Sequence, residues 1–191
     1  MSLEKQSLKE IINFRLQKLK KLREFGIDPY PHNFKQSNYS SELKNDFKNF
    51  ENKDVVIAGR IMAIRKMGKA SFFHLEDSSG RIQVYIKKDD VGESQYDMFK
   101  LLDIGDYAGV NGFVFKTKTK EISIHAKSIT VLAKSTRPLP IVKEKDGETF
   151  DSFEDKEQRY RNRHLDLIVN PEVKEVFKKS QKKIMFKLQK K

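Results

Sequence analysis

The chain has 191 residues and no cysteine, which excludes disulfide bonds and thiolate metal sites. No apolar run approaches the roughly 18 residues of a membrane span, and the N-terminus lacks the apolar core of a signal peptide, so we expect a cytoplasmic protein with no membrane partner. The formal net charge of +12 favours a polyanionic partner, but eight lysines against Glu175 lie in residues 174–191, so charge alone does not separate nucleic-acid binding from a solvated surface.

Residues 7–25 predict an amphipathic helix, because apolar side chains recur at nearly the i, i+3, i+4 spacing of a buried helical face. These positions are Leu8, Ile11, Ile12, Leu16, Leu19 and Leu22. Gly26 and the Asp28-Pro29-Tyr30-Pro31 run end the helix. The other face is basic and carries Lys9, Arg15, Lys18, Lys20, Lys21 and Arg23. That face either stays solvated while the helix covers its neighbour or also contacts phosphates.

Residues 32–53 are polar and weakly patterned, with few large apolar anchors. We predict a connector that contains one short helix over residues 41–50. Residues 1–54 are therefore expected to form an N-terminal helix and connector that precede the first domain.

Residues 55–134 predict a mainly β domain of five strands with one inserted helix. The strands are expected at residues 55–64, 71–76, 81–87, 107–115 and 121–132, and the helix at residues 93–102. The third strand is the clearest, because polar and apolar residues alternate in it without a break. Three strands, a helix and two strands fit the five-stranded Greek-key barrel called the OB-fold, whose face over strands two and three commonly binds oligonucleotides or oligosaccharides.

Side chains alternate between the two faces of a strand, so the apolar positions predict which residues lie on the outer surface of the barrel. If Ile82 and Val84 face the core, then Gln83 and Tyr85 face outward, and the same reasoning leaves the ring of Phe72 exposed. The outer face is expected to carry Phe72, His74, Gln83, Tyr85, Glu121, Ser123 and His125, extended by Arg65 at the end of the first strand.

Four of these residues have groups that can bind a nucleobase. Phe72 offers a ring face for stacking, and Gln83 has a donor and an acceptor for a base edge. Glu121 can accept from a base amino or imino group, and Arg65 can stack on a base or bind phosphate. Each residue taken singly is more often an ordinary surface residue, but their convergence on one face favours base recognition.

Catalytic groups are scarce in the sequence. The four histidines lack metal-ligand spacing, and neither a GxxxxGK[ST] nor a GxGxxG loop is present. We therefore predict no catalytic residue, no metal site and no cofactor in this chain.

Beyond the barrel, residues 135–157 are punctuated by Pro138 and Pro140 and predict an extended linker. Residues 158–191 are expected to begin a second domain that the chain leaves incomplete. In it we expect a short strand-like run after Arg163 and a lysine-rich helix over residues 172–191.

Several long motifs occur in a recognisable order. They are RKMGKASF (65–72), GRIQVY (80–85), FKTKTKEISI (115–124), RPLP (137–140) and RYRNRHLDLI (159–168). Together they closely resemble the N-terminal part of bacterial-type class II lysyl-tRNA synthetases, and the resemblance spans nearly the whole chain. The sequence departs from the family at two positions, because the family usually has glycine where Lys120 stands and tyrosine where His164 stands.

The resemblance implies an OB-fold that reads the uridine-rich anticodon of tRNA(Lys), with bases contacted by the residues that match Arg65, Phe72, Gln83 and Glu121. For the full-length enzyme it implies a homodimer that uses ATP and Mg²⁺ to attach lysine to tRNA. Because the family's catalytic motifs lie downstream of this stretch, we expect the chain to bind tRNA without charging it. Further candidates for RNA contact are Lys18, Lys20, Lys21, His74, Tyr85 and His125.

Two other interpretations remain open. A stand-alone OB module for single-stranded nucleic acid would explain the barrel, but it has no need of residues 159–171. An aspartate or asparagine tRNA ligase shares the barrel, but it fits residues 116–119 less well.

Overall fold

The structure is a computed structural model that describes residues 7–140, 143–145, 148–150, 153 and 155–189. The chain divides into two compact units, Met1–Pro138 and Leu139–Lys191. Within the described ranges, no helix combines the length and the apolar character that a membrane crossing requires.

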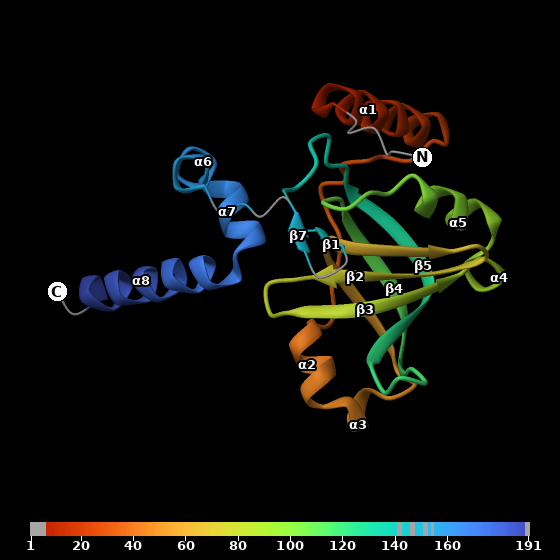
Figure 1. Cartoon of the computed structure of the whole chain (residues 1–191). Helices are drawn as coiled ribbons and strands as arrows, with labels where there is room; N and C mark the ends of the chain where they lie inside the picture. The colour runs from red at the N-terminus through yellow and green to blue at the C-terminus, as the bar shows by residue number, and fades with distance from the viewer. Residues whose placement is uncertain (1–6, 141–142, 146–147, 151–152, 154, 190–191) are drawn as a thin grey trace. The chain divides into compact units, whose positions relative to one another are not determined.

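The first unit is built on a closed five-stranded barrel (Figure 1). Its strands are β1 (Asp54–Met67), β2 (Ala70–Glu76), β3 (Arg81–Lys87), β4 (Tyr107–Lys116) and β5 (Ile122–Ala133). Around the barrel the strands follow the order β1-β2-β3-β5-β4, and β4 pairs back onto β1. The β3–β5 pairing is parallel and the others are antiparallel. The predicted mainly β OB-fold is therefore confirmed.

Burial alternates along the strands as the sequence predicts. In β3, Ile82, Val84 and Ile86 are buried, while the residues between them keep partial exposure. At Gly112, β4 passes so close to β5 that an added Cβ would lie 2.1 Å from the carbonyl oxygen of His125. A glycine is therefore required at position 112, opposite Ala126, because any side chain there would force the two strands apart.

Short helices flank the barrel. After β3 the chain forms α4 (Lys88–Val91), which the sequence did not predict, and then α5 (Glu93–Lys100). The α5 helix buries Tyr96, Met98 and Phe99 against the core, and the ring of Phe99 lies 5.2 Å from that of Phe73.

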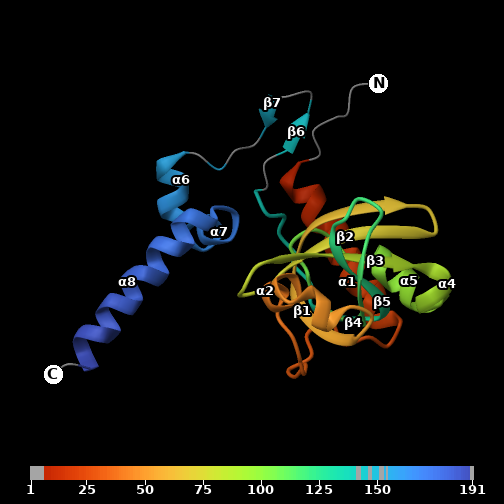
Figure 2. The same ribbon diagram turned by 90° about the horizontal axis from the view of Figure 1, so that it is seen from below.

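The single helix predicted over residues 41–50 is wrong in one respect, because two helices occupy this segment. They are α2 (Ser40–Asn45) and α3 (Phe47–Phe50), and Figure 2 shows them from below the barrel. The backbone leaves the helical conformation at Asp46, with φ −120° and ψ 42°. The Asp46 carboxylate accepts from the side-chain amide of Asn49 at 2.8 and 2.9 Å, a local hydrogen bond that competes with a continuous helix.

Helix α1 (Leu8–Glu24) begins at the capping box formed by Ser7 and Glu10. Its buried side differs from the predicted apolar stripe, because Leu8 is 58% and Leu16 is 44% exposed, whereas the buried residues are Arg15, Leu19 and Leu22.

Arg15 is buried because its guanidinium finds three carbonyl oxygens under the helix. It donates to Ile104, Ser135 and Arg137 at 3.0 to 3.2 Å. The prediction that Arg15 belongs to the free basic face is therefore wrong, since a buried guanidinium with these partners is satisfied internally.

In the second unit, β6 (Lys143–Lys145) and β7 (Glu148–Phe150) form a two-stranded antiparallel sheet within the predicted linker. Linker residues 141–142, 146–147, 151–152 and 154 lie outside the described residues. Three helices follow: α6 (Lys156–Arg161), α7 (Arg163–Val169) and α8 (Pro171–Gln189).

The strand-like run predicted after Arg163 is the helix α7, so this prediction is wrong. Asp166 is fully buried on α7 and accepts hydrogen bonds from Arg159, Arg163 and Asn170. These contacts on neighbouring turns outweigh the strand preference of the branched side chains near Val169.

Candidate nucleic-acid interface

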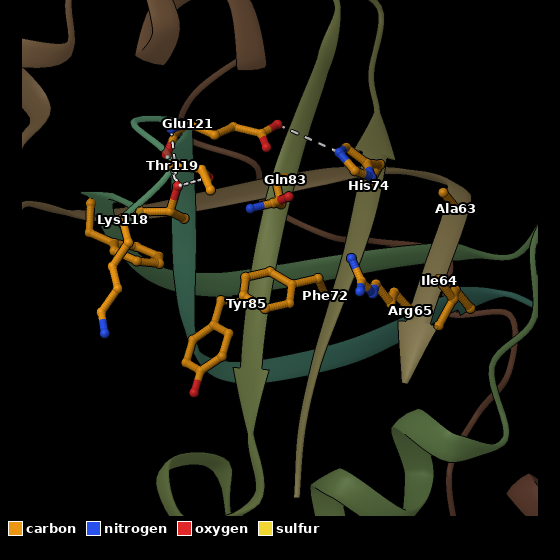
Figure 3. A pocket seen from close by; sticks show the side chains of 12 residues that line it. Ala63, Ile64, Arg65, Phe72, His74, Gln83, Tyr85, Lys118, Thr119 and Glu121 are labelled. Atoms are coloured by element: carbon orange, nitrogen blue, oxygen red, sulfur yellow. Dashed lines mark hydrogen bonds and ion pairs between the residues drawn. The ribbon is translucent and has the colours of Figure 1, made fainter. Parts of the chain in front are cut away.

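A pocket of about 710 Å³ lies on the outer face of the barrel, a volume typical of a small-ligand site. Figure 3 shows Gln83 between the side chains of Glu121 and His74, with Lys118 and Thr119 on one side and Arg65 on the other. All four predicted base-binding residues, Arg65, Phe72, Gln83 and Glu121, line this pocket, and so do His74 and Tyr85.

The strand register places these side chains in two rows across the sheet. An aromatic row is formed by Arg65, Phe72, Tyr85, His125 and Phe113, each the cross-strand partner of the next. A second, polar row is formed in the same way by Ala63, His74, Gln83, Ser123 and Phe115. Two residues along a strand separate the rows by about 7 Å, so each row can meet a different part of one nucleotide.

The rings of the aromatic row touch one another. Phe72 and Tyr85 have ring centroids 5.0 Å apart, and Tyr85 meets His125 edge-on at 5.0 Å. His125 in turn stacks on Phe113 at 4.8 Å with an interplanar angle of 28°. Because of these contacts Phe72 is half-buried rather than exposed as predicted. Its ring position is held in advance, which lowers the entropy lost when a base stacks on it.

A hydrogen-bond chain orients Gln83 in the polar row. Its side-chain amide donates to the Ser123 hydroxyl at 2.9 Å, and that hydroxyl donates to the Glu121 carbonyl at 3.4 Å. Ser123 lies on the predicted face but is buried, so the expectation of an exposed serine is wrong. The chain leaves the Gln83 carbonyl oxygen and one amide hydrogen for a ligand.

Glu121 is positioned by the loop that joins β4 to β5. The Thr117 hydroxyl accepts from the Glu121 backbone N–H at 3.0 Å, and Thr117 and Glu121 also pair through N–H and carbonyl at 2.9 Å. The Glu121 carboxylate lies 3.6 Å from Nε2 of His74, within reach of an ion pair when that imidazole is protonated. Lys120 adopts φ +64°, a left-handed conformation that glycine reaches without strain. A lysine therefore occupies a left-handed position in the loop directly before Glu121.

The pocket contains residues that the sequence reasoning missed. They are Ala63, Ile64, Phe115, Thr117, Lys118 and Thr119. Phe115 could have been found, because it alternates with the buried Val114 and so faces outward on β4. The loop residues carried no such signal, since their approach to β3 depends on barrel closure.

Four of the further candidates for RNA contact lie outside the pocket lining. His125 adjoins it through Tyr85, and its Nε2 lies 2.7 Å from the Asp90 carboxylate. Lys18 forms an ion pair with Asp103 at 2.5 Å and is only 13% exposed. Lys20 and Lys21 remain exposed, but residues two apart on a helix point to different sides, so Lys18 and Lys20 do not share a surface.

Metal-binding groupings are absent from the described part of the chain, where no three His, Asp or Glu side chains come together as a possible metal site. The pocket instead offers ring faces, an amide, a carboxylate and cations. This combination matches a nucleobase with its phosphate better than a metal ion.

Residues 55–132 match the model of the tRNA anticodon family, described as an OB-fold nucleic acid binding domain. Over 175 residues the chain is 50% identical to a lysine–tRNA ligase of Porphyromonas gingivalis, covering 86% of this chain and 30% of that protein. A lysine–tRNA ligase of Thermoanaerobacter pseudethanolicus is 49% identical over 178 residues, covering 93% of this chain and 34% of the relative. The chain thus spans about a third of the length of these curated relatives. Residues 55–132 are thus similar to the tRNA anticodon family of OB-fold nucleic-acid-binding domains, and over most of its length the chain is similar to lysine–tRNA ligases.

Proposed function

We propose that the pocket binds anticodon bases of tRNA(Lys) and that the chain is the tRNA-recognition part of a lysine–tRNA ligase. The observation that carries the proposal is the pair of rows, which brings a stacking ring and an oriented amide into one pocket. The identity of about 50% to lysine–tRNA ligases supports lysine as the amino acid concerned.

Uridine suits the groups that the polar row presents. The N3–H of uridine is a donor, and the Gln83 carbonyl oxygen is an acceptor whose orientation Ser123 holds. At the same position cytidine has an acceptor, which would face the Gln83 oxygen without a hydrogen between them. A buried polar group left unpaired in this way disfavours the wrong base.

The proposal is tested by measuring the affinity of the purified chain for anticodon stem-loops. A stem-loop with the uridine-rich lysine anticodon should bind more tightly than stem-loops with one anticodon base replaced. Equal affinity for every sequence would instead assign the barrel to a module that binds single strands without base preference. Preference for an aspartate or asparagine anticodon would exclude the lysine assignment.

Replacing Gln83 by alanine should reduce discrimination between uridine and cytidine more than it reduces total affinity, because base contacts specify while phosphate contacts position. The measurement compares stem-loops that differ in one anticodon base. Arg81→Ala is the matched control, since Arg81 lies on the same strand but pairs with Glu76 at 3.0 Å outside the pocket. An equal loss for both bases in Gln83→Ala would refute base reading by this amide.

We further propose that attachment of lysine, with ATP and Mg²⁺ as reactants and a homodimer as the working form, belongs to the full-length ligase. We assign no catalytic step to the described residues, where no three His, Asp or Glu side chains come together. Lysine-dependent pyrophosphate exchange by residues 1–191 should stay at background. Activity from a mass-verified preparation would overturn this part of the proposal.

A further inference from the structure

A second pocket, of about 420 Å³, lies where α1 meets the end of β1 and the chain between α5 and β4. It is lined by Arg15, Ile64, Lys66, Leu102, Asp103 and Ile104. Ile64 also lines the base pocket, so the two cavities share this residue in their walls. Two cavities that share a wall residue suit a ligand that is longer than either cavity.

Positive charge around the second pocket exceeds negative charge. Asp103 is shared between Lys18 at 2.5 Å and Lys134 at 2.6 Å, and Asp106 also pairs with Lys134 at 2.6 Å. Arg15 donates only to neutral carbonyl groups, so its charge has no carboxylate against it in those bonds. With Lys66 included, this region therefore holds four cations and two carboxylates, those of Asp103 and Asp106.

Lys66 is the cation that remains available. It is solvent-accessible, it donates to the Lys100 carbonyl at 3.0 Å, and its ammonium lies 5.9 Å from the centre of the Phe99 ring. No carboxylate pairs with it among the residues that the structure describes. Partial desolvation, and then repulsion from Lys18, lowers the pKa of Lys66. An anion in the pocket would stabilise the charged form of this side chain.

We propose that the second pocket binds a phosphate group of the RNA backbone, next to the nucleotide whose base occupies the base pocket, with Lys66 as the direct contact. This inference rests on the proposed function. A phosphate suits the position, because the linkage between nucleotides is the part of an RNA strand that carries a negative charge beside every base. Arg15, Lys18 and Lys134 hold the surrounding potential positive without leaving their internal partners.

The test uses the full 191-residue chain and the lysine anticodon stem-loop over a series of KCl concentrations. Lys66→Gln should reduce the slope of log affinity against log salt by about 0.7–0.9, the value for one phosphate contact. Binding should weaken by the same factor for every anticodon sequence. Lys66→Arg, which keeps the charge, should retain the wild-type slope. Lys44→Gln is the matched control, because it removes one exposed lysine on α2, which lies beyond the opposite end of the barrel from α1 (Figure 1).

A second arm separates the RNA backbone from free phosphate. Thermal unfolding is compared in sodium phosphate and in sodium chloride at equal ionic strength. If phosphate stabilises the wild type but not Lys66→Gln, and the RNA slope is unchanged, the pocket binds the free anion and the RNA assignment is overturned. The RNA assignment is also overturned if Lys66→Gln keeps the wild-type salt slope and phosphate does not stabilise the wild type. In that case a loss of affinity in Phe72→Ala would show that the proposed function stands. If the wild type binds no stem-loop, both the proposed function and the phosphate assignment are overturned.

Discussion

Replacing Lys134 by methionine should lower the free energy of unfolding of the barrel by about 3–5 kcal/mol, the cost of leaving a buried charge without its partner. The side chains of Lys134 and Asp106 are both 0% exposed, and their charged atoms lie 2.6 Å apart. Methionine keeps the length of the side chain and removes the cation. Burial favours the neutral form of Asp103, yet hydrogen bonds from Lys134 and then Lys18 hold the pKa of that carboxyl below its usual value.

The measurement is urea unfolding followed by tyrosine fluorescence. This signal reports on the barrel, because five of the six tyrosines precede residue 139. Lys127→Met is the matched control. Lys127 pairs with Asp54 at the same distance of 2.6 Å, but the two side chains are 54% and 63% exposed, so its loss should cost less than about 1 kcal/mol. Equal losses in the two variants would contradict a special role for the buried pair.

The Lys134 network joins three parts of the first unit. Lys18 comes from α1, Asp103 and Asp106 come from the chain before β4, and Lys134 directly follows β5. Asp106 also accepts from the backbone N–H of Ser135 at 2.8 Å. Removing the central cation should therefore loosen α1 as well as the end of the barrel.

Phe72→Ala should weaken binding of the lysine anticodon stem-loop by about 1–3 kcal/mol, since one stacked base is worth this much. That range corresponds to a loss of roughly 5- to 150-fold in affinity. The fold should change little, because the ring of Phe72 lies on the outer face of β2, whereas the adjacent Phe73 fills the core with 1% exposure. Equilibrium titration with a fluorescent stem-loop measures the affinity, and thermal unfolding measures the fold.

Tyr39→Ala provides the comparison for Phe72→Ala. Tyr39 is an exposed aromatic residue at the start of α2 and does not line the pocket, so its removal should leave affinity unchanged. If Phe72→Ala unfolds the barrel, the ring supports the core and the stacking role is wrong. If both variants lose affinity alike, the aromatic row is not the binding surface.

Much of the barrel and its binding face followed from the sequence. Alternation in β2 and β3 placed Phe72 and Gln83 outward, and in the structure both line one pocket with Arg65 and Glu121. The helix predicted over residues 7–25 likewise agrees with α1 (Leu8–Glu24). These features depend on residues a few positions apart, and such short spacings determine which face of a strand or helix a side chain takes.

The tertiary structure decided how the charged residues are used. Arg15 and Lys18 look alike in sequence to Lys20 and Lys21, yet their partners lie between 85 and 122 positions away along the chain. The same holds for Ser123, which is buried and accepts a hydrogen bond from Gln83 of another strand. A basic side chain is bonded internally when the closed barrel brings a carbonyl or carboxylate oxygen within about 3 Å of it, and otherwise it stays available for a ligand. Local periodicity carries no information about those distances.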